Sequence, residues 1–302
     1  MTETSAAADG AAHGYRAHAT LTFATEFRRQ LTRRRTQVTL ALLTVLPVVL
    51  YIAFAVGPGN GDGDDDSGNA FALADFATTG AANFVLFALL VSASFLLVVV
   101  AALFSGDTIA SEASWGSLRY LLAVPVPRGR LLAVKYGVAL AYTVIAMMLL
   151  TGASLAVGAL AYGWHPLQAP LGGEIDGMAA LGRVLGVAGY LAVTMLVVSS
   201  LALLLSVLTD APLAAVGGAV MLHIVSNILN SVTALGALRD VLPTRYAQAW
   251  LGLLSEPAQY DEMVRGIVTS LLYATVFTAC AFWRFARKDI TSLVWSGACP
   301  AQ

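Results

Sequence analysis

The sequence predicts an all-α integral membrane protein with six transmembrane helices and both termini in the cytoplasm. Three observations predict this fold: an apolar composition, six apolar runs of spanning length, and an uneven placement of basic residues. Hydrophobic residues make up 58% of the 302 positions and charged residues 12%, with a mean hydropathy of +0.76. A soluble domain of this size could not bury so much apolar surface, so we expect the bilayer to be its solvent.

Each predicted span is a run of about 20 mostly apolar residues, the length that crosses roughly 30 Å of hydrocarbon. The runs cover about residues 38–56, 81–104, 131–162, 184–208, 213–229 and 267–285. Gly106 and Asp107 follow the second run, and we expect them to end that helix and to begin a new one. Residues 1–20 are expected to be a disordered tail, residues 21–290 a single transmembrane domain, and residues 291–302 a cytoplasmic tail.

The basic residues predict the orientation of the chain. With the N-terminus inside, all but four of the 17 Lys and Arg residues fall on the cytoplasmic side. The four that fall outside are Arg183, Arg239, Arg245 and Arg265. Because cytoplasmic loops carry the excess of Lys and Arg, this distribution places both termini inside.

An amphipathic helix is expected over residues 21–35, before the first span. Its apolar side chains share one face and its arginines lie mostly around the other, namely Phe23, Ala24, Phe27 and Leu31 against Arg28, Arg29, Arg33 and Arg35. This pattern is typical of a helix that lies among the cytoplasmic lipid head groups. The alternative is an ordinary basic flank without a defined helix.

A polar segment, GDTIASEASWGSLRYLLAVPVPRGR (106–130), interrupts the apolar pattern between the second and third spans. We expect a short amphipathic helix here on the cytoplasmic side, with Trp115, Leu118 and Leu122 on its apolar face. Pro125 and Pro127 would end it. Three basic residues would then anchor the next span at the head groups: Arg128, Arg130 and Lys135.

This segment resembles the signature of ABC type-2 permeases, the membrane subunits of ATP-driven exporters. The matching positions are Gly106, Glu112, Gly116, Ser117, Leu118, Pro125, Arg128 and Lys135. The resemblance extends over nearly the whole chain, through the basic interfacial helix, the six spans, the long last external loop and the basic exit FWRFARKDI. It implies a coupling helix seated in a separate ATP-binding subunit, with coupling residues Asp107, Glu112, Trp115, Gly116, Leu118 and Arg119.

The resemblance also implies the partners and the cargo. These are an ATP-binding subunit, a second permease copy in a homodimer or a related heterodimer, and an exported drug, antibiotic, lipid or other amphipathic molecule. The sequence has no G-x-x-x-x-G-K-[ST] phosphate loop, so we expect ATP and magnesium on the partner subunit and no cofactor or enzymatic activity on this chain. Glu112 is expected either to pair with a basic residue of the ATPase or cap a neighbouring helix, or to form a salt bridge with Arg119 or Arg128 of its own chain.

The fifth span carries a polar stripe. His223, Ser226, Asn227 and Asn230 recur at helical spacing and share a face. Such side chains must turn away from lipid, because nothing there satisfies their hydrogen bonds. We expect them either at a dimer interface or substrate path, or as polar contacts that hold helices together. Tyr246 and Trp250, in the last external loop, are candidates for an external gate or for aromatic anchors.

Other function classes fit the sequence less well. An ion- or proton-coupled secondary transporter would need ionisable residues at midspan, where only His223 stands. A membrane anchor or sensor subunit that transports nothing is the other alternative. No Cys/His cluster has metal-ligand spacing, and the acidic loop that begins at Asp62 does not fit a calcium-binding pattern, so no metal is expected. The expected location is the cell membrane, crossed several times.

Overall fold

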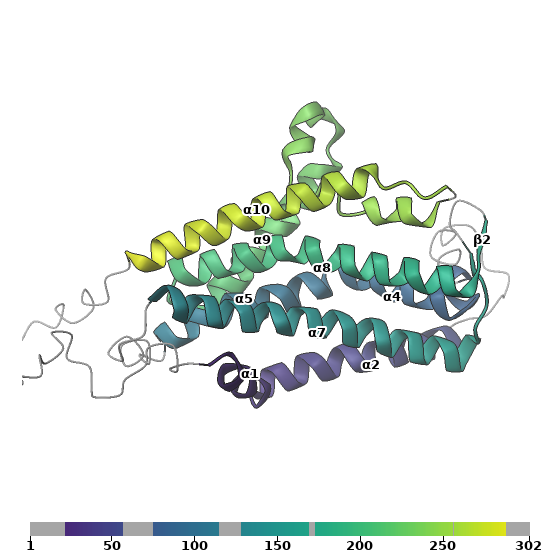
Figure 1. The fold of residues 1–302 in the computed structure, drawn as a ribbon, viewed down its shortest axis with the longest axis horizontal. Helices are drawn as coiled ribbons and strands as arrows, with labels where there is room; N and C mark the ends of the chain where they lie inside the picture. Colours follow the sequence, from purple (N-terminus) through teal and green to yellow (C-terminus); the bar gives the residue numbers. More distant parts are fainter. Residues whose placement is uncertain (1–21, 57–74, 115–127, 169–172, 256, 288–302) are drawn as a thin grey trace, which may run out of the picture.

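The computed structural model describes residues 22–56, 75–114, 128–168, 173–255 and 257–287, which are almost entirely helical. Long helices run side by side along one axis, and a small excursion leaves the bundle sideways (Figure 1). The helices are α1 (Phe23–Leu31), α2 (Arg34–Val56), α4 (Ala81–Ser94), α5 (Leu96–Ser114), α7 (Arg128–Tyr162), α8 (Gly177–Leu208), α9 (Pro212–Ser231) and α10 (Asp261–Ala286), with the 3-10 helices η2 (Thr233–Val241) and η3 (Ala249–Leu254).

Six of the helices are long and apolar enough to cross a membrane: α2, α5, α7, α8, α9 and α10. The predicted count of six and the all-α membrane class are therefore confirmed. Helices α2, α9 and α10 turn most of their apolar surface outward, whereas α5 and α8 are mostly buried. Exposed side chains such as Leu213 and Leu222 suit contact with lipid or with another membrane subunit.

The second predicted span differs from the structure. It consists of two helices, α4 and α5, which meet at Phe95 with the non-helical angles φ −143° and ψ −54°. Helix α5 then continues through Gly106 and Asp107 to Ser114, so the predicted break at these two residues is wrong. Gly106 instead permits a close approach of α9, because a Cβ atom there would lie 2.9 Å from Cγ2 of Val216.

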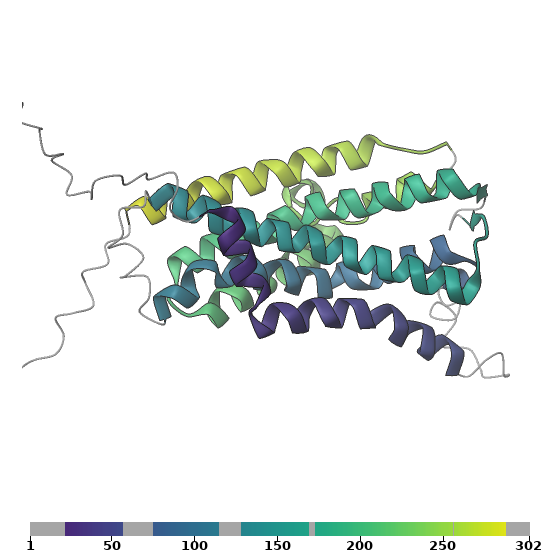
Figure 2. The ribbon, with the colours of Figure 1, turned by 60° about the horizontal axis from the view of Figure 1, so that its bottom comes forward.

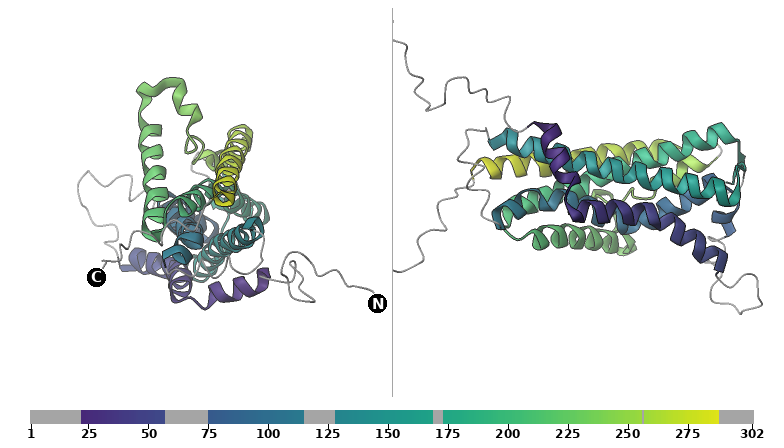
Figure 3. Two further views of the ribbon diagram at one scale, coloured as in Figure 1. Left: turned by 90° about the vertical axis from the view of Figure 1, so that its left-hand side faces the viewer. Right: turned by 90° about the horizontal axis from the view of Figure 1, so that it is seen from below.

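The helix ends place most of the basic residues together. Helices α5, α8 and α10 end, and α7 and α9 begin, at one end of the bundle, which we call the basic end (Figure 2). Helix α1 lies across the bundle near this end, and α2 follows it after a turn at Thr32 and Arg33 (Figure 2 and Figure 3). The separate amphipathic helix predicted before the first span is thus present.

The opposite end is closed by a two-stranded antiparallel hairpin, β1 (Leu167–Gln168) and β2 (Glu174–Ile175), between α7 and α8. The Asn83 side chain at the start of α4 donates to the carbonyl of Gln168 at 3.1 Å and accepts from its amide at 3.2 Å. Helix α8 packs against α5, α7, α9 and α10, and α9 leads away from the bundle to η2 (Figure 3).

Candidate functional site

Several of the predicted functional residues that the structure describes gather at two places, a partly buried group of charges at the basic end and a cavity beside α9. The charges come from four helices, of which α5 and α7 are far from α1 and α2 in the sequence. We call them the charge cluster: Glu26 and Arg29 on α1, Arg33 in the following turn, Arg35 on α2, Asp107 and Glu112 on α5, and Lys135 on α7.

Lys135 lies at the centre of the charge cluster. Its Nζ donates to Oε1 of Glu26 at 3.0 Å and to Oε1 of Glu112 at 3.1 Å. The side chains of Lys135 and Glu112 are each only 3% exposed. A buried ammonium group is costly without partners, so these two carboxylates are what makes Lys135 tolerable in the interior.

Three arginines of the charge cluster pair with the two carboxylates of α5. Arg29 donates to Glu112 at 3.1 Å, and Arg33 donates to Asp107 at 3.2 Å. Arg35 also pairs with Asp107. Burial lowers the pKa of Arg33, and the neighbouring positive charge of Arg29 lowers it further. The carboxylates of α5 are thereby shared among helices α1, α2 and α7.

Local sequence explains how α1 supplies its part. Glu26 and Arg29 are three residues apart on α1, which brings them to one side of the helix, and Arg33 follows in the turn before α2. Aromatic packing fixes the helix against α7, since the rings of Phe27 and Tyr142 are stacked with centroids 4.7 Å apart. The hydroxyl of Tyr142 also donates to the carbonyl of Phe27 at 2.8 Å.

Three of the predicted residues, Lys135, Asp107 and Glu112, make contacts inside the bundle that the sequence did not predict. Lys135 is not a head-group anchor, because its ammonium faces the carboxylates of α1 and α5 inside the bundle. The same kind of contact buries Asp107 and Glu112, whose carboxylates tie α5 to the other helices of the charge cluster. Glu112 forms ion pairs within its own chain, with Arg29 and Lys135 as described partners.

The remaining coupling residues lie outside the part of the chain that the structure describes: Trp115, Gly116, Leu118 and Arg119. The same holds for the side chain of Arg128, although α7 begins at this residue. Arg130 is in the first turn of α7 and partly exposed.

The second place is an open cavity of about 970 Å³ between α4, α8, α9 and the segment from Arg239 to Glu262. Three members of the predicted polar stripe line it, His223, Asn227 and Asn230, together with the predicted gate residue Trp250. Ser226 does not line it and instead forms a 2.8 Å hydrogen bond with the hydroxyl of Thr244. The stripe is therefore divided, with Ser226 packing the helix and its neighbours facing the cavity.

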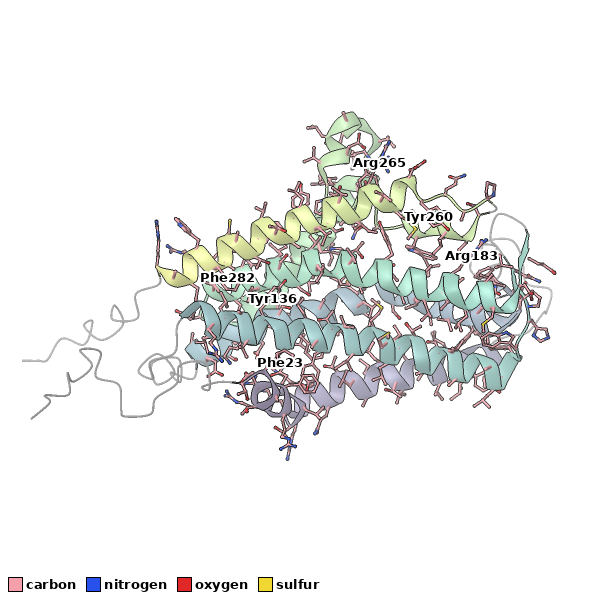
Figure 4. All side chains as sticks on the ribbon, in the orientation of Figure 1. Phe23, Tyr136, Arg183, Tyr260, Arg265 and Phe282 are labelled. Atoms are coloured by element: carbon pink, nitrogen blue, oxygen red, sulfur yellow. The ribbon has the colours of Figure 1, made fainter. Side chains whose placement is uncertain are left out.

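Side chains of α8 and α10 hold the segment that covers the cavity. Tyr190 donates to the carbonyl of Tyr246 at 2.5 Å, so the predicted gate residue Tyr246 is fixed through its backbone and does not itself line the cavity. Arg183 donates to the carbonyls of Leu253 at 3.1 Å and Ser255 at 3.2 Å. Figure 4 shows Arg183 beside η3, far from Phe282 near the basic end.

Sequence reasoning missed several of these roles. It treated Arg183 and Arg239 only as external basic residues, and it assigned no role to Tyr190. Tyr190 lies within a continuous apolar run, so no pattern distinguished it from an ordinary core residue. Among the described residues, no group of three or more His, Cys, Asp or Glu could hold a metal ion.

Comparison with known proteins adds one finding. A family model described as "ABC-2 family transporter protein" matches residues 22–290. This range includes both the charge cluster and every residue of the cavity. A search among curated proteins finds none with significant similarity to the chain.

Proposed function

We propose, from the premise that this chain belongs to the ABC-2 family of transporter proteins, that it forms the translocation path of an ATP-driven exporter. Membership makes it a permease subunit, a multi-pass protein of the cell membrane whose family works with an ATP-binding subunit. The outward direction, the pairing with a second permease copy and an amphipathic cargo belong to the proposal.

The charge cluster is the observation that carries this proposal. Residues 115–127 connect the end of α5 to the start of α7, and these two helices are joined by the Glu112–Lys135 pair. Glu26 and Arg29 add α1 to the same unit. A force on residues 115–127 would therefore move α1, α5 and α7 together. This is what a coupling segment driven by an ATPase requires.

The cavity supports an amphipathic cargo. Its wall combines apolar side chains such as Leu191, Met195 and Ile224 with polar ones such as His223 and Asn227. A cavity of about 970 Å³ is at the upper end of the usual size for small-molecule sites. The proposed cargo is thus a molecule with both an apolar body and a polar group.

Substitution of Trp115 tests the coupling role. We expect Trp115→Ala to weaken co-purification of the permease with its ATP-binding subunit and to reduce cargo-stimulated ATP hydrolysis, because large apolar side chains dominate such interfaces. Trp164→Ala, which removes a half-exposed Trp near the hairpin at the opposite end, is the matched control and should change neither. Equal partner retention and equal hydrolysis in the two variants would rule out this coupling role.

Labelling tests the orientation. In a background with Cys280→Ala and Cys299→Ala, Ser114→Cys places a thiol on an exposed position at the basic end of α5, and Trp164→Cys places one near the hairpin. An impermeant maleimide added to intact cells should label Trp164→Cys and leave Ser114→Cys unlabelled until the cells are opened. The reverse pattern would put the basic end outside, where no intracellular ATPase could act on it.

A further inference from the structure

The cavity beside α9 is lined by a cation that has no partner within the described part of the chain. Arg239 lines the cavity, and its Nε is buried and has no hydrogen-bond partner among the described residues. No ion pair of its guanidinium group is present within this part of the chain either. The other arginine in the wall, Arg245, is balanced by Asp240, whose Oδ1 lies 3.1 Å from its Nε.

Asn230 provides a second unsatisfied group in the same wall. Its Nδ2 donates to the carbonyl of Thr244 at 3.4 Å, whereas its Oδ1 is buried without a partner. A buried polar atom that lacks a hydrogen bond costs free energy, and an unpaired charge beside a membrane costs more. Both Arg239 and Asn230 line the cavity, so its wall is suited to a ligand that brings an anionic acceptor to Arg239 and a donor to Asn230.

We infer that this cavity binds an amphipathic anion, with a phosphate or carboxylate group at Arg239 and an alkyl or aromatic body among the apolar side chains. Arginine suits these groups because its planar fork of donors matches their oxygens. Leu191, Met195 and Ile224 offer the apolar surface, and the buried Trp250 offers an aromatic face. As an identification of the cargo class, this inference rests on the proposed function, but binding itself requires neither ATP nor the partner subunit.

Glu262 is the charged residue of the wall that opposes this assignment. Glu262 lies in the first turn of α10 and is exposed, whereas Nε of Arg239 is buried. Water therefore weakens the electrostatic interaction of a ligand with Glu262 more than its interaction with Arg239. If Glu262 determined the preference instead, the cavity would select a cationic amphiphile. A cationic probe therefore belongs in the test.

Quenching of Trp250 measures occupancy of the cavity directly. The purified permease, without its ATPase, is placed in phosphatidylcholine nanodiscs and titrated with undecyl phosphate that carries bromine at the end of its tail. Trimethylammonium and glucoside probes with the same brominated tail serve as the cationic and neutral comparisons. We expect the phosphate to bind about 10- to 100-fold more tightly than either, the range of one hydrogen bond to a charged group. Because the chain has five Trp residues, the signal of Trp250 is the part of the quenching that Trp250→Phe removes.

Two arginine variants decide the role of Arg239. Arg239→Gln should abolish the preference for the phosphate probe, whereas Arg265→Gln should keep it, because Arg265 is an exposed arginine that does not line the cavity. An equal loss in both variants, equal binding of all three probes, a preference for the cationic probe, or undiminished quenching in Trp250→Phe would each overturn the inference. None of these outcomes bears on coupling through residues 115–127.

A second experiment distinguishes a membrane lipid from a free amphiphile as the source of the bound anion. Nanodiscs that also contain phosphatidylglycerol supply an anionic head group from the bilayer itself. If a membrane lipid is the occupant, this lipid should weaken probe binding to the wild-type permease and leave binding to Arg239→Gln unchanged. If a free amphiphile is the occupant, the two proteins should respond to the added lipid equally.

Discussion

Replacing Lys135 with Met removes the central cation of the charge cluster and nearly preserves the length of the side chain. Glu26 and Glu112 then lose the ammonium group that lies 3.0 Å and 3.1 Å from their oxygens. Breaking a buried ion pair by removing one partner costs about 3–5 kcal/mol, because the other charge stays buried. Arg29 still reaches both carboxylates, at 3.5 Å and 3.1 Å, so we place the loss near the lower limit, about 3 kcal/mol.

Unfolding in mixed micelles measures this loss. The purified permease is titrated with sodium dodecyl sulfate, helical circular dichroism follows unfolding, and the free energy of unfolding is compared between variants. Arg284→Met is the matched control, since Arg284 is an exposed arginine in the last turn of α10, also at the basic end. Substitutions at such surface positions usually change the free energy of unfolding by about 0.5 kcal/mol or less.

A double-mutant cycle then tests whether the Lys135–Glu112 pair itself is responsible. Glu112→Gln removes one of the two carboxylates that Lys135→Met leaves without their lysine. We expect the double variant to be more stable than the sum of the single losses predicts, by at least about 1 kcal/mol, because residues in one ion-pair network couple by about 0.5–3 kcal/mol. Additive losses, or a Lys135→Met variant as stable as Arg284→Met, would refute the account of the charge cluster.

Two further substitutions test the packing around α5 and the cavity by the same titration. Gly106→Ala should destabilise the permease by about 1–3 kcal/mol, since its new Cβ would lie 2.9 Å from the Val216 side chain and 3.2 Å from the Val216 backbone nitrogen. Gly152→Ala is the control, because a Cβ there meets open space, and it should be neutral or stabilising by up to about 1 kcal/mol. Tyr190→Phe should cost about 1 kcal/mol and speed proteolysis of the segment that contains Tyr246, because it removes the hydrogen bond that fixes this segment to α8. Equal stability of the two glycine variants, or an unchanged cleavage rate in Tyr190→Phe, would contradict these contacts.

The sequence predicted those features that depend on local pattern. Long apolar runs identified the spans, because a helix in lipid must satisfy its own backbone. The spacing of His223, Asn227 and Asn230 predicted a shared face, and these three side chains do line one cavity. The amphipathic helix before the first span was predicted for the same reason. Periodicity reports which side chains point the same way, and that is a local property.

Features that depend on distant partners could not be predicted in this way. The break at Phe95 lies in an apolar run with no Gly or Pro beside it, so no local signal indicated it. Lys135 and Glu26 are 109 positions apart, and Arg29 and Glu112 are 83 apart, so their pairing follows only from the packing of α1 against α5 and α7. Spacing within one helix also could not separate Ser226 from Asn227, because the difference arises from Thr244 on another segment.

The buried position of the charge cluster bears on its role. A buried ion pair adds little net stability compared with apolar side chains of the same volume, so stability alone does not account for the four buried members of the cluster, Glu26, Asp107, Glu112 and Lys135. Charged side chains can exchange one partner for another when helices shift, and Glu112 already contacts both Arg29 and Lys135. An apolar junction would have no such alternative partners. The coupling proposed for residues 115–127 requires α1, α5 and α7 to stay joined under load, and charges with several partners meet this requirement better than apolar side chains do.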